Sequence, residues 1–282
     1  NHGAGKEAHS IELATLINCL NVEKSKSCGE CGSCKKMKTL QHGNLKIIHP
    51  MPRGKKNISS NSSPVEFLSK SDLEDYKENI LLKSQNPYYK IKLPKANSIL
   101  IDSIRSLKKD LFLTSVEKGW NIVLILDAEK LCYPNNVSAN SLLKILEEPP
   151  EKTLFILITS NYSKIINTIK SRCQQIFFPP LATEEIYKII DPSISDADKL
   201  VIANISNGNM NLAIDLEKSI NELYDNLKLF INSCYDSNFQ YDSVIIEKIN
   251  SLKRSNNYEL LLFFRIITIY FKDLFVFSKS KD

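Results

Sequence analysis

Two uninterrupted apolar runs constrain the fold of this chain more than any other feature. They are NIVLIL at residues 121–126 and LFILIT at residues 154–159, with a helical pattern over 138–148 between them. Strands that are apolar on both faces are typical of parallel sheets covered by helices on each side. Pro149 and Pro150 end the intervening helix, because proline cannot continue it. The pattern predicts an α/β domain with a parallel sheet.

The remaining elements follow from hydrophobic periodicity and from proline and glycine positions. Before the first apolar run we expect a helix over residues 5–21, a short strand over 46–49 and a loop over 50–64. A charged helical segment over 65–83, a connector over 86–97 and a second helix over 101–111 should follow. After the second run we expect one more short strand over residues 176–178 and three short helices over 183–190, 196–204 and 209–218. Residues 220–282 should be helical throughout, apart from a polar stretch near 234–242. Residues 50–97 are long and polar, and no role is assigned to them.

Four cysteines follow the first expected helix with the spacing C-x8-C-x2-C-x2-C: Cys19, Cys28, Cys31 and Cys34. Two residues between cysteines form a tight turn that lets successive thiolates converge on one ion at about 2.3 Å, and four such ligands close a tetrahedron. A closed shell leaves no open position for catalysis. The spacing predicts a structural zinc knuckle over residues 19–34, and free thiols or two disulfides are the alternatives.

The composition is that of an ordinary globular protein from a reducing compartment. The 282 residues, 43% of them hydrophobic, suffice for two or three domains, and the net charge of +5 neither demands nor excludes nucleic acid. The odd count of seven cysteines fits a cytosol better than a disulfide framework. The three scattered cysteines are expected to be buried apolar residues: Cys132, Cys173 and Cys234. The apolar stretch 260–277 contains charged residues, so we expect no membrane span and a cytoplasmic location.

Several short motifs occur in a distinctive order. A Gly5-Lys6 loop opens the first helix and precedes the knuckle; further along come SANSLLKILEEPP at 138–150, Thr-Ser-Asn at 159–161 and Ser-Arg-Cys at 171–173. This order resembles the bacterial DNA polymerase III clamp-loader ATPases of the AAA+ class, that is, the gamma/tau and delta-prime subunits. The resemblance runs to about residue 216.

The resemblance implies a fold and a set of partners. It implies an AAA+ nucleotide-binding-like domain over residues 1–180, a three-helix lid over 181–218 and an all-helical oligomerisation domain over 219–282. Because the chain opens inside the phosphate-loop motif, we expect a preceding strand to be missing. The implied partners are the gamma/tau and delta subunits in a ring, the sliding clamp, and primer-template DNA reached through the polymerase holoenzyme.

The phosphate loop departs from the pattern of nucleotide hydrolases. In G-x-x-x-x-G-K-[ST], backbone N–H groups and the lysine hold the phosphates, and the hydroxyl binds Mg²⁺. Gly5 and Lys6 match, but Glu7 stands at the hydroxyl position. A carboxylate there adds negative charge beside the phosphates. The alternative is a glycine turn that opens a helix without any ligand.

The first apolar run ends in Asp127, Ala128 and Glu129. Hydrolysing members of the family carry adjacent Asp and Glu, one for the metal and one for the attacking water. Asp127 remains, while Ala128 occupies the place of the catalytic carboxylate. A shift of one residue in a strand turns a side chain to the other face, so Glu129 is expected to be a solvated charge.

Two further positions resemble nucleotide sensors. Thr159 matches sensor 1, with strand-end capping as the alternative, and Asn211 stands where the sensor 2 arginine is expected. Departures at Glu7, Ala128 and Asn211 argue against ATP and magnesium in this chain's own site. The resemblance leaves a remnant nucleotide pocket lined by five residues: Gly3, Gly5, Lys6, Asp127 and Thr159.

Arg172 matches the family's arginine finger, which enters the ATP site of a neighbouring subunit and stabilises charge on the transferred phosphoryl group. The alternative is a surface charge. A finger without a working pocket predicts a delta-prime-type subunit, and Arg172 is its one catalytic candidate, acting in trans. An ATP-hydrolysing gamma/tau-type subunit and a zinc-containing nucleic-acid-binding module are the competing hypotheses.

Overall fold

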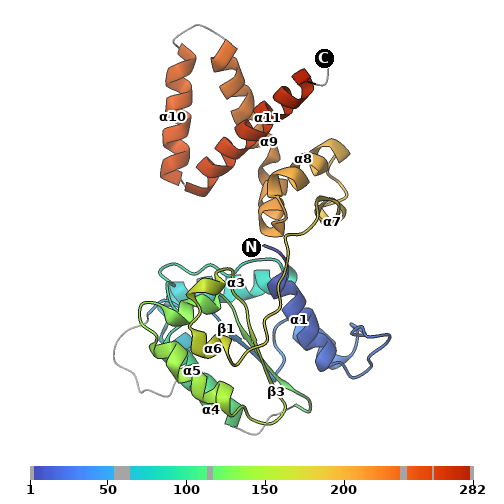
Figure 1. The fold of residues 1–282 in the computed structure, drawn as a ribbon, viewed down its shortest axis with the longest axis vertical. Helices are drawn as coiled ribbons and strands as arrows, with labels where there is room; N and C mark the ends of the chain where they lie inside the picture. Colours follow the sequence, from blue (N-terminus) through green and yellow to red (C-terminus); the bar gives the residue numbers. More distant parts are fainter. Residues whose placement is uncertain (1–2, 54–63, 113–116, 236–239, 256, 280–282) are drawn as a thin grey trace. The chain divides into compact units, whose positions relative to one another are not determined.

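The computed structural model describes residues 3–53, 64–112, 117–235, 240–255 and 257–279. The chain divides into two compact units, Asn1–Pro179 and Pro180–Asp282 (Figure 1). The first unit holds the sheet with its covering helices, and the second is built from helices.

A parallel sheet of three strands forms the centre of the first unit. The strands are β1 (Leu45–Ile48), β2 (Asn121–Ile125) and β3 (Thr153–Leu157), in the spatial order β1-β2-β3. In this register Ile122 lies opposite Leu45 on one side and Leu154 on the other. The predicted α/β parallel sheet is confirmed, with β2 in the middle because its residues are apolar on both faces.

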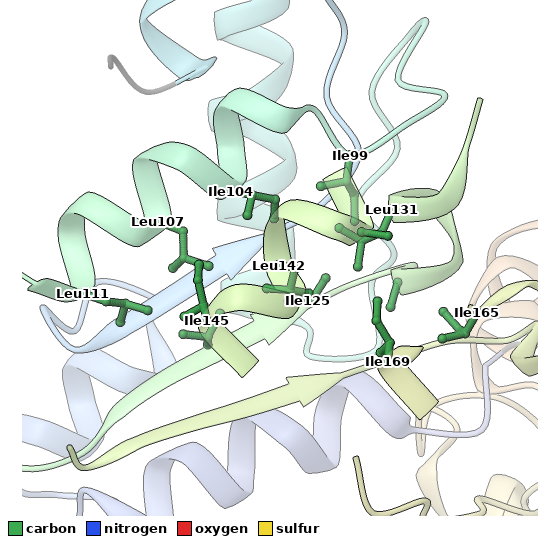
Figure 2. Close-up of a cluster of buried hydrophobic side chains, with 13 residues drawn as sticks. Ile99, Ile104, Leu107, Leu111, Ile125, Leu131, Leu142, Ile145, Ile165 and Ile169 are labelled. Carbon is green, nitrogen blue, oxygen red and sulfur yellow. The ribbon is translucent and has the colours of Figure 1, made fainter. Parts of the chain in front are cut away.

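Successive residues of β2 enter two different cores, as the two-residue period of a strand requires. Ile122 and Leu124 pack on the side of α1 (Lys6–Ile17) and α2 (Gly32–Lys38). Val123 and Ile125 face the opposite core, to which three other helices contribute: α4 (Ile101–Phe112), α5 (Val137–Glu147) and α6 (Asn167–Lys170). Figure 2 shows side chains of α4 and α5 gathered over the sheet in this second core. The first unit is therefore three-layered.

Part of the polar region 50–97 forms a helix of its own. A 3-10 turn (Pro64–Phe67) leads into α3 (Lys70–Gln85), which begins at the Ser69 cap, and residues 86–100 return to α4. Most of the expected loop 50–64, residues 54–63, lies outside the described residues. Helix α3 has no strongly apolar face, so its sequence alone gives little indication of what it packs against.

Two sequence-based expectations are wrong. Residues 176–178 form no strand; Ile176 and Phe177 are 72% and 74% exposed, and no strand within the described ranges pairs with the segment to complete its hydrogen bonds. Cys234 is exposed on the second unit, whereas Cys132 and Cys173 are partly buried against the core. Apolar composition over a few residues does not distinguish a strand from an extended connector.

The second unit contains five helices among its described residues: α7 (Thr183–Ile189), α8 (Asp196–Ser206), α9 (Met210–Tyr235), α10 (Gln240–Ser255) and α11 (Asn257–Lys279). The expected lid boundary between residues 218 and 219 falls inside α9, which continues without a break. The division of this unit into a lid and an oligomerisation domain stays a prediction. None of the helices in the described ranges has the length and apolarity required to cross a membrane.

Candidate functional site

The four cysteines expected to bind a metal lie together. Their sulfur atoms are all within 4.8 Å of one another, with 3.6 Å between Cys19 and Cys28 and 3.8 Å between Cys28 and Cys34. Four sulfurs at about 2.3 Å from a central ion in a tetrahedron are about 3.8 Å apart, so the spacing suits one metal ion. The structure therefore places all four residues where the sequence predicted a metal centre.

Backbone N–H groups of the knuckle point at these sulfurs. The N–H of Cys34 donates to Cys31 Sγ at 3.4 Å, and the N–H of Cys28 donates to Cys19 Sγ at 3.3 Å. The Cys34 N–H bond is the main cause that lowers the pKa of Cys31 to about 6, whereas burial raises the pKa of Cys34 to about 12. Sulfurs this close cannot all become thiolates unless a cation compensates their charge. This donor set fits a divalent metal.

A polar network behind the knuckle attaches it to the domain. Ser33 Oγ donates to the Asn18 carbonyl at 2.6 Å and lies 3.1 Å from His42 Nε2. The same His42 nitrogen lies 2.9 Å from Glu117 Oε2, and its other ring nitrogen accepts from the Asn44 N–H at 3.1 Å. Burial lowers the pKa of His42. Helix α2 is thus joined to the segment that precedes β2.

A second polar cluster lies where all three strands end. His49 follows β1, Asp127 follows β2, and Thr159 and Ser160 follow β3. In open parallel sheets, ligands bind at this carboxyl edge. Lys6, the first residue of α1, reaches the same edge, where its Nζ donates to Ser160 Oγ at 3.4 Å. The structure therefore brings Lys6, Asp127 and Thr159 of the predicted pocket together.

The glycines before α1 have left-handed backbone conformations. Gly3 and Gly5 have φ of 69° and 76°, in the left-handed region that side chains with a Cβ rarely occupy. A Cβ on Gly5 would also lie 3.0 Å from His9 Nδ1 and 3.4 Å from Tyr88. Glycine is therefore required at residue 5 by both backbone and space.

Glu7, at the hydroxyl position of the loop, forms an ion pair with Lys83 of α3. The Lys83 side chain is 1% exposed, and its Nζ also donates to the carbonyls of Pro87 at 2.8 Å and Tyr89 at 2.7 Å. These three acceptors use all three ammonium hydrogens. Burial lowers the pKa of Lys83, and the Glu7 carboxylate opposes that shift. Glu7 is therefore the counter-ion of a fully buried lysine.

Asp127 is also paired with a lysine. Lys90, in the connector after α3, donates to Asp127 Oδ1 at 2.9 Å. Asp127 has a left-handed backbone with φ of 49°, a strained conformation that turns the chain out of β2 into a 3-10 helix (Ala128–Cys132). Asp127, assigned from the sequence to a remnant nucleotide pocket, thus faces an ammonium group of the same chain.

The expectation of a solvated Glu129 is wrong. Glu129 Oε2 accepts a hydrogen bond from Thr159 Oγ1 at 2.6 Å and acts on the charge of Lys6. The alternation expected for a strand fails here because the chain after Asp127 is helical. Ala128 is fully buried in the core beside α4 and α5. No carboxylate occupies the position that the hydrolysing members use.

We call these six side chains the lysine–carboxylate cluster: Lys6, Lys83, Lys90, Glu7, Asp127 and Glu129. Three lysines and three carboxylates give the cluster a formal charge of zero. Burial lowers the pKa of Lys6, and the carboxylates Glu7, Glu129 and Asp127 raise it again. The cluster compensates its charges without any added ion.

The sequence was compared with known protein families and with curated proteins. Residues 1–182 match the family model described as DNA polymerase III, delta subunit. The chain belongs to this family. The curated relatives bear the names delta', gamma and tau of DNA polymerase III, so the family is that of the clamp-loader subunits.

Relatives within the clamp-loader family are distant. The delta' subunit of Bacillus subtilis is 26% identical over 77% of this chain and 51% of its own length. The gamma/tau subunit of Mycoplasma genitalium is 24% identical over 99% of this chain and 42% of its own length, so the chain spans about half or less of these relatives. A solved DNA polymerase III gamma subunit-related protein from Thermotoga maritima is 19% identical, with a TM-score of 0.36 over 81% of this chain and 68% of its own.

Arg172, the candidate arginine finger of this clamp-loader chain, lies just after α6. Its guanidinium donates to Glu147 Oε1 at 2.6 Å and to the Thr168 carbonyl at 2.9 Å. Arg172 and Glu147 side chains are 34% and 48% exposed, so a solvated ion pair holds the arginine near the surface. Asn211 belongs to the second unit, at the start of α9.

Four residues of the sheet edge were missed in the sequence of this clamp-loader chain: Lys83, Lys90, His49 and Tyr76. Tyr76 of α3 stacks on His49, with ring centroids 5.8 Å apart and planes at 17°. Burial lowers the pKa of His49, whose Nδ1 donates to the Pro50 carbonyl at 2.8 Å. No local pattern marks these residues, because each acts on a group far away in the sequence.

Proposed function

We propose that this chain is a delta-prime-type subunit of a bacterial DNA polymerase III clamp loader, acting in the cytoplasm. In this role it completes a ring with gamma/tau and delta subunits and helps to load the sliding clamp on primer-template DNA. It does not turn over ATP itself. The supporting observation is the carboxyl edge of the sheet, where Glu7 and Asp127 are paired with lysines of the same chain.

Arg172 is the residue through which the subunit acts on its neighbour's ATP. It lies on the surface of the first unit, and its only acidic partner in the described residues is the half-exposed Glu147. An exposed pair of this kind contributes little to stability, so the guanidinium can exchange Glu147 for a phosphate at small cost. In trans it would stabilise charge on the transferred phosphoryl group.

Zinc is the metal that we assign to the knuckle. Four cysteine sulfurs in a closed tetrahedral arrangement are typical of structural zinc, and they leave no open position for a substrate. The knuckle would then stabilise the segment that connects α1 to β1. Its contribution to the subunit is structural.

The arginine finger is tested by reconstituting the loader with Arg172→Ala. The neighbouring site should lose about 10³-fold in the rate of ATP hydrolysis in a single-turnover measurement. Arg105→Ala is the control, because Arg105 is an exposed arginine that pairs with Asp102 on α4. Unchanged turnover in an intact ring contradicts the proposal.

The competing gamma/tau-type function draws on relatives that bear the names gamma and tau. It requires ATP turnover by the full-length protein itself. Steady hydrolysis by the purified subunit, lost when Lys6 is replaced by Ala, would favour that function over the delta-prime type.

A further inference from the structure

Helix α3 and the connector after it meet the loop before α1 at the edge where nucleotide would bind in this family. The contacts are spread along α3 and the connector: Tyr76 stacks on His49, and Lys83 and Lys90 pair with Glu7 and Asp127. The contacts connect α3 to the ends of β1 and β2 and to the first turn of α1. We define residues 70–97 as the lysine segment.

Magnesium and a nucleotide do not fit the residues present. A bound Mg²⁺ needs a hydroxyl from the loop and an acidic ligand after the strand. Here Glu7 replaces the hydroxyl, and one oxygen of each carboxylate, Glu7 Oε2 and Asp127 Oδ1, already accepts from an ammonium group. A nucleotide would add several negative charges to a cluster whose formal charge is already zero.

We propose that the lysine segment is a built-in substitute for the metal and nucleotide, with Lys83 and Lys90 supplying the positive charge that Glu7 and Asp127 need. Glu7 then stabilises the folded chain and is more than a nonfunctional replacement for the loop hydroxyl. The proposal deepens the proposed function, since it explains how a non-hydrolysing site stays folded, but it rests on the contacts within the first unit alone.

Burial determines which of the two lysine contacts matters more. Lys83 is almost inaccessible and has three acceptors, so it cannot lose Glu7 without leaving a buried cation under-compensated. Lys90 and Asp127 keep 27% and 20% of their side-chain surface, so water can replace part of that contact. The Glu7–Lys83 pair is therefore the main attachment of the segment.

The test is a double-substitution cycle on the full-length protein, read by thermal unfolding. Glu7→Thr restores the hydroxyl of a hydrolase loop, yet it should lower the melting temperature because Lys83 keeps its buried charge. Adding Lys83→Met to Glu7→Thr should recover part of that loss, which makes the two changes non-additive. Lys92→Met is the matched control, an exposed lysine of the same segment that should change the melting temperature little.

Three results would each overturn the proposal. The first is additive effects of Glu7→Thr and Lys83→Met, and the second is a Glu7→Thr variant as stable as the wild type. The third is saturable binding of Mg-ATP or Mg-ADP to the wild-type protein in calorimetric titration. If Glu7→Thr does not fold, Asp127→Asn and Lys90→Met give the same cycle at the second contact.

Neither the thermal unfolding cycle nor the calorimetric titration involves partner subunits. A protein that fails the Arg172 test can still show the coupling between Glu7 and Lys83, and a functional clamp-loader subunit can still lack it. The two proposals therefore stand or fall separately.

Discussion

The knuckle and the lysine–carboxylate cluster differ in how the charges of their side chains are compensated. Each gathers groups that repel or desolvate one another, and each must be compensated to remain folded. The knuckle takes its four sulfurs from sixteen consecutive residues and needs a cation from outside. The cluster draws on residues from Lys6 to Glu129 and supplies its own cations.

The difference shows that a cluster of charged or ionisable groups can be compensated from outside the chain or from within it. The four ligands of the knuckle are all thiols, which become negatively charged when they bind a metal, so together they need the charge of the ion. At the sheet edge, Lys83 and Lys90 make the external ion unnecessary. The stability of the knuckle should therefore depend strongly on a bound ion, whereas that of the lysine–carboxylate cluster should not.

Removal of the knuckle's metal should have the largest effect. Cys34→Ser, or a chelator that strips the ion, should abolish zinc binding, measured as metal content per protein, and lower the free energy of unfolding by several kcal/mol, since such ions contribute about 10–16 kcal/mol in small zinc domains. Cys234→Ser, at an exposed cysteine outside the cluster, is the control. Unchanged unfolding after complete metal loss contradicts a structural role.

Loss of a lysine from the cluster should come next. Lys83→Met leaves Glu7 without its counter-ion and should cost about 3 kcal/mol in urea unfolding, because one partner of a buried pair is removed. Lys90→Met should cost about 1 kcal/mol, since its pair with Asp127 is partly solvated. Equal losses would mean that burial does not decide the strength of the two contacts.

Two glycines offer a smaller, paired comparison. Gly5→Ala should cost about 1–2 kcal/mol, because its φ of 76° is left-handed and the new Cβ meets His9. Gly32→Ala at the start of α2 has nothing within 4 Å and should be neutral or slightly stabilising. Melting temperatures of the two variants measure the difference, and similar values would show that the loop before α1 is not held in this conformation.

Protonation of His49 should give an effect that is present only at acidic pH. Burial lowers the pKa of His49 below its usual 6.5, so below that pH the unfolded chain binds a proton that the folded chain excludes. The stability from this group is complete above pH 6.5 and is lost as pH falls toward the folded pKa, with a slope of up to about 1.4 kcal/mol per pH unit. His49→Phe keeps a ring beside Tyr76 and should flatten urea-unfolding stability between pH 6.5 and 5; an unchanged slope would contradict the assignment.

Local sequence spacing predicted the whole knuckle but only part of the lysine–carboxylate cluster. The knuckle could be located because all of its ligands lie close in sequence, and β2 and β3 because each is a single apolar run. Lys83 could not be found, since its partner Glu7 lies 76 residues away and α3 carries no strong apolar face that would predict burial. Glu129 was misplaced because a left-handed residue, Asp127, ends the strand period one step earlier than the sequence suggests.

Helix α9 is the element that the other long helices of the second unit share. Its 26 residues form one continuous helix about 39 Å long. Helices α8, α10 and α11 all contact it. Helices that precede and follow α9 in the chain are therefore supported by the same element.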